Sequence, residues 1–288
     1  LDLIDSTKKF GSLRYKYMPF ILSPKLAKFY CRYFQKDLKN SIERLHGDGL
    51  FINAQSPECL EEPYWIKTSK KSLENLSPHG FSKSTAKGYA YLLNSFLEIE
   101  LKKKLVIKNN NHHLRIESLA TFFPNSDILF LFRSPVAQAK SLLEIHKKFI
   151  YFQNRDKFIL RYMNLLGHWE FGKGKKFFTY NESEYNQLRE LEPTKINYWL
   201  QQWINTYSWI LNVVSNKNLK NLKLVCYEDI CDDFEYRNNL LYELNIDHSL
   251  INFELKKGSS NDSNFIPGLS DNLKKKAEEI YFKLREKS

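Results

Sequence analysis

The sequence predicts an α/β fold in which helices flank a parallel sheet of about four to five strands. The clearest signals are three short apolar runs, LVIK (105–108), DILFLF (127–132) and LKLVCYED (222–229), which are typical of strands buried on both faces. A segment with helical periodicity follows each run. Strands that alternate with helices at this spacing favour parallel pairing through crossover helices.

The first hundred residues are expected to contain two longer helices. Aromatic and aliphatic side chains at helical spacing indicate the two longer helices of this part, and glycines mark the loop between them. In chain order we expect the tail of a helix at 1–9, a strand or extended segment at 10–18, a helix at 24–45, a loop at 46–58 and a helix at 82–103.

The rest of the chain supplies the helices that cover the sheet. In order, we expect a short helix at 114–123, a helix at 136–149, mainly helical structure over 156–215, a helix at 233–244 and a basic amphipathic helix at 270–287. No internal repeat or low-complexity linker divides the chain. Residues 1–288 are therefore expected to form a single domain.

The composition is basic, with a formal net charge of +11. This charge favours anionic partners such as phosphorylated ligands, although a solvated lysine-rich surface explains it equally well. The cysteines form no CxxC pair and match no zinc spacing, so no metal is expected and a reduced cytoplasmic location is the default. No apolar run reaches the ~18 residues of a membrane span.

Polar residues follow the ends of the three predicted strands. They are Lys108, Arg133 and the pair Tyr227-Glu228. Because open α/β sheets bind ligands at the carboxyl ends of parallel strands, we expect these residues to line one crevice. Arg133 is followed by a turn and by a helix that carries Ser141. A guanidinium, a hydroxyl and a helix N-terminus together suit a phosphate monoester.

Arg133, Pro135 and Ser141 resemble a motif of the sulfotransferases that use 3′-phosphoadenosine 5′-phosphosulfate (PAPS). The family often has Asp between the Arg and the Pro, where this chain has Ser134. Phrases typical of a microbial subgroup of this family occur in the expected order: YMPF (17–20), RLHGDGL (44–50), SPECLEEPYW (56–65), IKNNN (107–111), RYMNLLGHWEFG (161–172) and VCYEDI (225–230).

The resemblance implies a fold related to nucleotide kinases and a binding site for PAPS. By its pattern, Arg133 and Ser141 would hold the 3′-phosphate of the donor. Lys256-Lys257-Gly258 resembles an Arg-Lys-Gly stretch that closes over the same phosphate in many members.

The general base is harder to assign. Many members have Lys-Thr-His after the corresponding strand, whereas this chain has Lys108 followed by three asparagines, so that Asn110 stands in the place of the His. Lys108 remains a candidate for neutralising charge on the transferred group. Glu61, Glu62 and His46 are the main candidates for the base, because crowded carboxylates raise one another's pKa; Asp48, His112 and His113 are alternatives.

Members of the family open with a strand and a Gly-rich loop that cradles the 5′-phosphosulfate. No such loop occurs in the sequence, and residues 1–9 are interpreted as the remainder of the helix that would follow it. We therefore expect the N-terminal strand and this phosphosulfate-binding loop to be missing before Leu1.

The resemblance implies transfer of a sulfuryl group from PAPS to a hydroxyl or amine of a small molecule or glycan, releasing 3′,5′-ADP. An ATP-dependent small-molecule kinase is a rival interpretation, but it would need a P-loop lysine and Mg²⁺ ligands. A non-catalytic nucleic-acid-binding or scaffold protein is a second rival. No helix-turn-helix, RNP or zinc-finger signature occurs, so nucleic acid is not an expected partner.

Overall fold

The parallel strands of the protein occur in two pairs. The computed structural model describes residues 1–33, 40–45, 49–57, 61–69, 75–247, 249, 251 and 266–288. In one pair β1 (Phe10–Ser12) lies beside β4 (Lys104–Val106), and in the other β5 (Ile128–Phe132) lies beside β6 (Leu222–Cys226). The α/β class is confirmed. Within the described ranges, however, these strands pair two by two and do not form one sheet of four or five.

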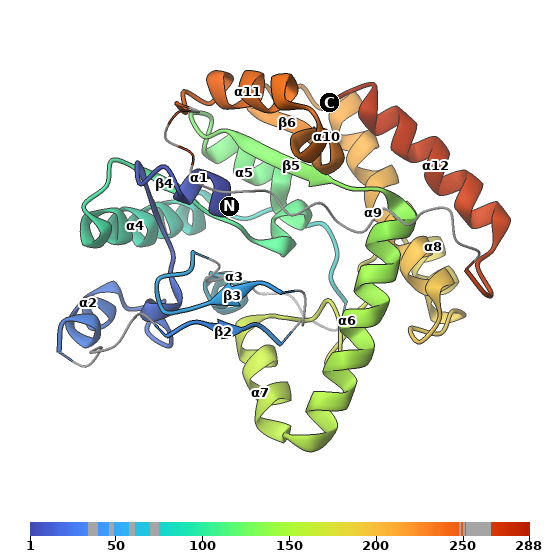
Figure 1. Cartoon of the computed structure of the whole chain (residues 1–288), viewed down its shortest axis with the longest axis horizontal. Helices are drawn as coiled ribbons and strands as arrows, with labels where there is room; N and C mark the ends of the chain where they lie inside the picture. Colours follow the sequence, from blue (N-terminus) through green and yellow to red (C-terminus); the bar gives the residue numbers. More distant parts are fainter. Residues whose placement is uncertain are drawn as a thin grey trace.

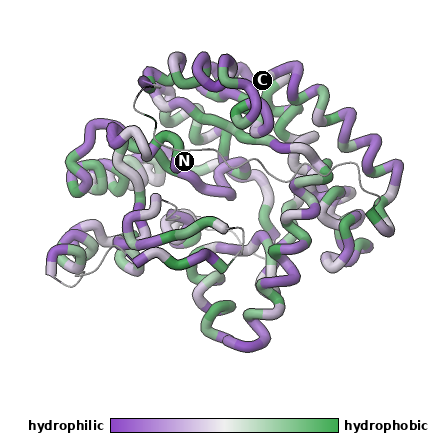
Figure 2. The backbone as a smooth tube through the Cα atoms, in the orientation of Figure 1, coloured by the Kyte–Doolittle hydropathy of each residue, from purple (hydrophilic) through white to green (hydrophobic). Residues whose placement is uncertain are grey.

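The β5–β6 pair has an unbroken register from Ile128 opposite Leu222 to Phe132 opposite Cys226. Figure 2 shows that β5 is mostly hydrophobic. This apolar run is the signal by which the sequence predicts the strand. Three long helices pack with this pair into the largest core: α6 (Pro135–Arg155), α9 (Ile196–Asn216) and α12 (Asp271–Arg285). Figure 1 shows α9 and α12 running side by side next to the strands.

A second core lies around α4 (Lys83–Glu100) and α2 (Pro24–Tyr33). Its buried aromatic side chains come from segments far apart in the sequence: Tyr17, Trp65, Tyr89 and Phe96. Arg14 joins this core to α1 (Asp2–Asp5), because its Nη2 lies 2.7 Å from Asp5 Oδ1 and its Nε lies 2.9 Å from Glu100 Oε2. Burial favours the neutral form of Glu100, but hydrogen bonds from Tyr17 and Arg14 outweigh it and lower the pKa of Glu100.

The remaining elements are short. They are η1 (Tyr15–Tyr17), the antiparallel pair β2 (Ile42–Glu43) and β3 (Phe51–Ile52), α3 (Glu62–Thr68), η2 (Asn110–Arg115), α5 (Ile116–Phe122), α7 (Lys157–Leu166), α8 (Glu182–Arg189), α10 (Tyr227–Asp232) and α11 (Phe234–Glu243). None of the helices within the described ranges is long and apolar enough to cross a bilayer.

Several expected boundaries are wrong. The helix expected at 24–45 is described as Pro24–Tyr33, whereas Ile42–Glu43 is a strand. Its partner strand, Phe51–Ile52, lies inside the loop expected at 46–58. The strand expected to reach residue 229 ends at Cys226, because its partner β5 ends opposite it at Phe132. Tyr227–Asp232 then forms a helix. Of residues 1–9, only Asp2–Asp5 are helical.

Candidate functional site

Arg133 stands at the carboxyl end of β5, in the turn that leads into α6. Its guanidinium carbon lies 5.6 Å from the centre of the Tyr227 ring. The next residue, Ser134, donates its backbone N–H to Glu228 Oε1 at 2.9 Å, and Glu228 Oε2 accepts from the Tyr281 hydroxyl at 3.2 Å. The start of α10, directly after β6, and the helix α12 therefore hold this turn in place, and two of the three expected strand ends come together.

Ser141 lies in the second turn of α6 and is partly exposed. It shares a helix face with Ser134 and Gln138, because the spacing is i, i+4, i+7. Gln138 Oε1 accepts from Trp203 Nε1 at 3.1 Å and from the Tyr207 hydroxyl at 3.0 Å, which fixes this face against α9. No acidic residue occupies the first turn of α6. An anion there would meet a favourable helix dipole.

A second cluster of polar side chains surrounds Glu61, just before α3. Glu61 has no exposed surface, and three side chains converge on its Oε1: His112 Nε2 at 2.9 Å, Asn109 Nδ2 at 3.0 Å and the Tyr89 hydroxyl at 3.1 Å. Burial alone would raise the pKa of Glu61. The interactions with His112 and Asn109 outweigh it, so the pKa is lowered. The expectation that crowding raises this pKa is therefore wrong for Glu61.

Glu62 lies beside Glu61 but faces an arginine, Arg115. Both of its oxygens lie near Arg115 Nη2, at 2.7 and 2.9 Å, and Oε2 also accepts from Asn109 Nδ2 at 2.9 Å. The Arg115 guanidinium stacks on Trp65, with its carbon 4.6 Å from the ring centre. Glu62 is thus held in a buried ion pair, and Asn109 links it to Glu61.

The third buried carboxylate of this cluster is Glu170. Its Oε1 accepts from Asn110 Nδ2 at 3.1 Å, and its Oε2 lies 3.5 Å from His168 Nδ1. Burial opposes ionisation of Glu170, but His168 and Asn110 lower its pKa. Burial lowers the pKa of the neighbouring His113 to about 4, so this imidazole is neutral at neutral pH. The segment that follows β4 thus connects all three carboxylates.

Several buried polar atoms of this cluster have no hydrogen-bond partner among the described residues. They are Glu61 Oε2, Trp65 Nε1, Asn111 Oδ1, His112 Nδ1, His113 Nε2, Arg115 Nε and Nη1, and Glu170 Oε2. Buried polar groups are nearly always hydrogen-bonded, so a concentration of unpaired ones is typical of a site completed by water or a polar ligand.

Only some of the expected site residues lie in the part of the chain that the structure describes. Lys108 follows β4 and is exposed, directly before the Asn109 that binds Glu61 and Glu62. His46 and the stretch Lys256-Lys257-Gly258 lie outside the described residues. Sequence reasoning missed Arg115 and Glu170. The polar run of residues 108–115 directly after an apolar strand is the signal that could have pointed to this region.

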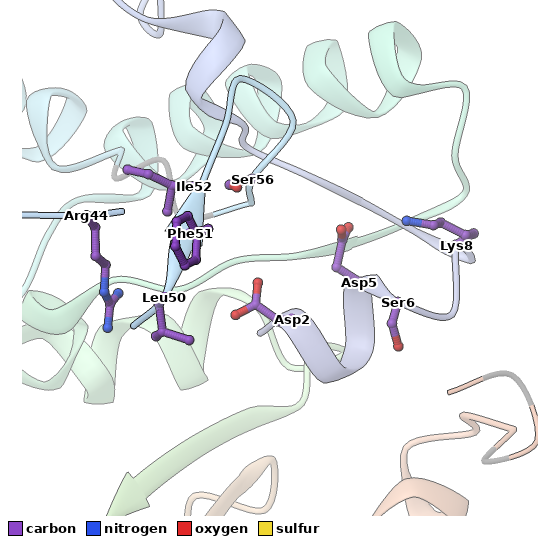
Figure 3. Close-up of a pocket in the computed structure, with 9 residues that line it drawn as sticks. All are labelled: Asp2, Asp5, Ser6, Lys8, Arg44, Leu50, Phe51, Ile52 and Ser56. Carbon is purple, nitrogen blue, oxygen red and sulfur yellow. The ribbon is translucent and has the colours of Figure 1, made fainter. Parts of the chain in front are cut away.

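Two surface hollows lie apart from these clusters. One, of about 260 Å³, opens between α1 and the β2–β3 pair, where Asp2, Asp5 and Arg44 lie around Phe51 (Figure 3). The other, of about 470 Å³, lies between α6 and the start of α9 and is lined by Lys140, the neighbour of Ser141, and by Lys147 and Lys195. None of the expected site residues lines either hollow.

No group of three or more His, Cys, Asp or Glu side chains in the described part of the chain is arranged to hold a metal ion. Comparisons with protein-family models, curated proteins and solved structures find no match.

Proposed function

We propose that this protein transfers a sulfuryl group from PAPS to a hydroxyl or amine of a small molecule or glycan. The observation that carries the proposal is the turn between β5 and α6, with Arg133 at the strand end and Ser141 two helical turns later. About 9 Å of helix axis separates Pro135 from Ser141, a distance that a phosphate and the two side chains can bridge. The α/β arrangement agrees with a nucleotide-kinase-like sulfotransferase fold.

The pair Glu61–His112 is the best candidate for the general base. The acceptor would attack the sulfur while its proton passes to the pair, and the bond between sulfur and the bridging phosphate oxygen would break to release 3′,5′-ADP. Glu61 Oε1 holds His112 Nε2, which leaves His112 Nδ1 and Glu61 Oε2 as the unpaired acceptor atoms. Glu62 is engaged by Arg115 and is assigned a positioning role.

Lys108 would stabilise the negative charge that develops on the leaving phosphate. It follows the carboxyl end of β4 as Arg133 follows that of β5, and these ends are where α/β sheets bind ligands.

Nucleotide binding tests the donor assignment. Calorimetry should show that 3′,5′-ADP binds far more tightly than 5′-AMP. Arg133→Ala should weaken the binding of 3′,5′-ADP roughly 10–150-fold, because a charge-assisted hydrogen bond contributes about 1.5–3 kcal/mol. Arg189→Ala is a matched control, since this exposed arginine also lies over a tyrosine ring, at 5.5 Å. Equal binding of 3′,5′-ADP and 5′-AMP would refute the proposal.

The base assignment has its own test. Glu61→Gln should lower kcat by ~10²–10⁴ while the affinity for 3′,5′-ADP stays unchanged, because the base contacts the acceptor and not the donor. The measurement is release of 3′,5′-ADP from PAPS with a panel of phenol and sugar acceptors. A normal kcat in the folded Glu61→Gln variant would exclude the pair as the base.

A further inference from the structure

The helix α7 carries more apolar surface than the protein covers. One stripe faces inward: Met163 is buried, and Ile159 packs against the main core. A second stripe points outward, and its side chains are largely exposed: Phe158 by 65%, Tyr162 by 37% and Leu165 by 71%. A helix that is apolar on so much of its circumference is normally buried. The exposed outward stripe therefore indicates a surface that contacts a partner.

The outward stripe is an ordered surface. Its residues follow the i, i+4, i+7 spacing and therefore share one face of α7. The rings of Phe158 and Tyr162 are stacked, with centroids 5.7 Å apart and planes 19° apart. At about 100° per residue, Lys157 and Arg161 form a neighbouring stripe on the side away from the core, and both are exposed. Apolar and basic stripes thus adjoin on the outer surface.

The end of α6 extends this surface. Tyr151 is 52% exposed, and the Arg155 guanidinium carbon lies 4.5 Å from its ring centre. Figure 1 shows α6 and α7 as a hairpin that projects from the body of the molecule, and Figure 2 shows apolar residues recurring along it. We call residues 147–165 of this hairpin the hairpin surface.

The charge of the hairpin surface is strongly one-sided. Five exposed basic residues lie on it: Lys147, Lys148, Arg155, Lys157 and Arg161. Lys147 is paired with Glu144, with Nζ and Oε1 3.7 Å apart, so the excess charge lies mainly with the others. Its one acidic residue, Asp156, caps α7 by accepting from the Phe158 backbone N–H at 2.8 Å. The complementary partner is therefore both anionic and able to accept apolar side chains.

We propose that the hairpin surface docks on an anionic lipid membrane. Phe158, Tyr162 and Leu165 would enter the boundary between head groups and acyl chains, while Lys157 and Arg161 contact lipid phosphates. The combination of a basic polar face with aromatic and leucine side chains is typical of helices that lie in the plane of a membrane. Two copies of this chain fit the face less well, because a symmetric contact would bring the basic stripes together. The proposal is independent of the transferase function.

Vesicle binding tests the proposal. The full chain should sediment with phosphatidylcholine vesicles that contain phosphatidylglycerol and remain in solution with phosphatidylcholine alone, and salt should weaken the binding. The double variant Phe158→Ser/Leu165→Ser should lose at least ~10-fold in partition coefficient, since each change removes exposed apolar area that the membrane would bury. Lys157→Gln/Arg161→Gln should reduce the preference for anionic vesicles.

Tyr242→Ser is the matched control, because Tyr242 is an 83% exposed aromatic on α11, outside the hairpin surface. It should bind vesicles like the unaltered protein, and circular dichroism should show the same thermal midpoint for all variants. Equal vesicle binding by the Phe158→Ser/Leu165→Ser variant would overturn the proposal. So would a dimer in sedimentation velocity, without lipid, that this variant converts to a monomer.

Discussion

At the scale of single residues, Gly167 shows how tightly the carboxylate cluster is packed. It follows α7 with a φ of +73°, and a Cβ placed there would lie 2.4 Å from Glu62 Cγ. Its carbonyl also accepts from Asn111 Nδ2 at 3.3 Å. A glycine is therefore needed here both for its backbone conformation and for the close approach of Glu62.

We predict that Gly167→Ala destabilises the protein more than Gly268→Ala does. Gly268 has nearly the same φ, +78°, but a Cβ added to it would meet no described atom within 4 Å. Both changes incur about 1–2 kcal/mol of left-handed strain, and only the first adds ~1–3 kcal/mol for pushing Glu62 away from Arg115. Urea denaturation measures the difference in the free energy of unfolding. If both variants lose the same free energy of unfolding, Glu62 can move away from the added methyl group without cost.

Glu61 shows why residue roles were only partly predictable. The crowded acidic residues after Pro57 marked this region as a source of carboxylates. The partners that lower the pKa of Glu61, His112 and Asn109, come from a distant part of the sequence. Local composition therefore indicated a candidate but could not show that its charge is compensated.

At the scale of elements, α12 closes the main core. Its residues Ala277, Ile280 and Leu284 are buried against the other helices, whereas Phe282 is 63% exposed. This contrast follows from the helical period, which places Ile280 and Leu284 on one face and Phe282 on another.

We expect Leu284→Ala to cost about 2–5 kcal/mol of stability, because it removes buried methyl groups and leaves a cavity. Phe282→Ala, on the same helix, should cost less although it removes a larger side chain, since that side chain already meets solvent. Chemical denaturation of both variants supplies the comparison. A larger loss for Phe282→Ala would mean that α12 packs differently.

Elements with regular periodicity were predicted best. The helix expected at 82–103 is observed as Lys83–Glu100, and the one expected at 270–287 as Asp271–Arg285. The helix expected at 24–45 failed because Ile42–Glu43 pair with Phe51–Ile52, a contact that local spacing does not reveal. Strand register and long-range pairing are the parts that periodicity cannot supply.

At the scale of the whole molecule, two histidines with lowered pKa values make the fold sensitive to acid. Burial lowers the pKa of His113 to about 4. Burial, together with the nearby Lys175, lowers the pKa of His146 to about 4 as well. His146 Nδ1 accepts from the Gly172 backbone N–H at 3.0 Å, a bond that protonation of this nitrogen would break.

We predict that stability falls as the pH drops from about 6.5 to about 4. In this window the unfolded chain binds protons at both histidines while the folded protein does not, so each contributes a slope of up to about 1.4 kcal/mol per pH unit. His146→Gln should remove about half of that slope in urea denaturation followed across this range. A slope unchanged by the substitution would exclude His146 as a source of the effect.

The α/β class could be predicted from the sequence, but the arrangement of the strands could be predicted only in part. Apolar runs identified β5 and β6, and these two strands pair in parallel as expected. How the strand pairs associate depends on backbone partners that hydrophobic runs do not specify. Likewise, Arg133 and Tyr227 were expected at one edge and lie together, whereas the carboxylate cluster depends on side chains from four separate segments.

The dependence of the Arg133 turn on α12 has a consequence for biosynthesis. Tyr281 packs its ring on Phe132, with centroids 5.8 Å apart, and bonds Glu228, which in turn holds Ser134. A ribosome adds about 5–20 residues per second, so Tyr281 is made on the order of ten seconds after Arg133. During that interval the nascent chain has β5 but not the helix that supports its turn. The turn that carries Arg133 should therefore reach its final arrangement only late in translation, after the strand that leads into it.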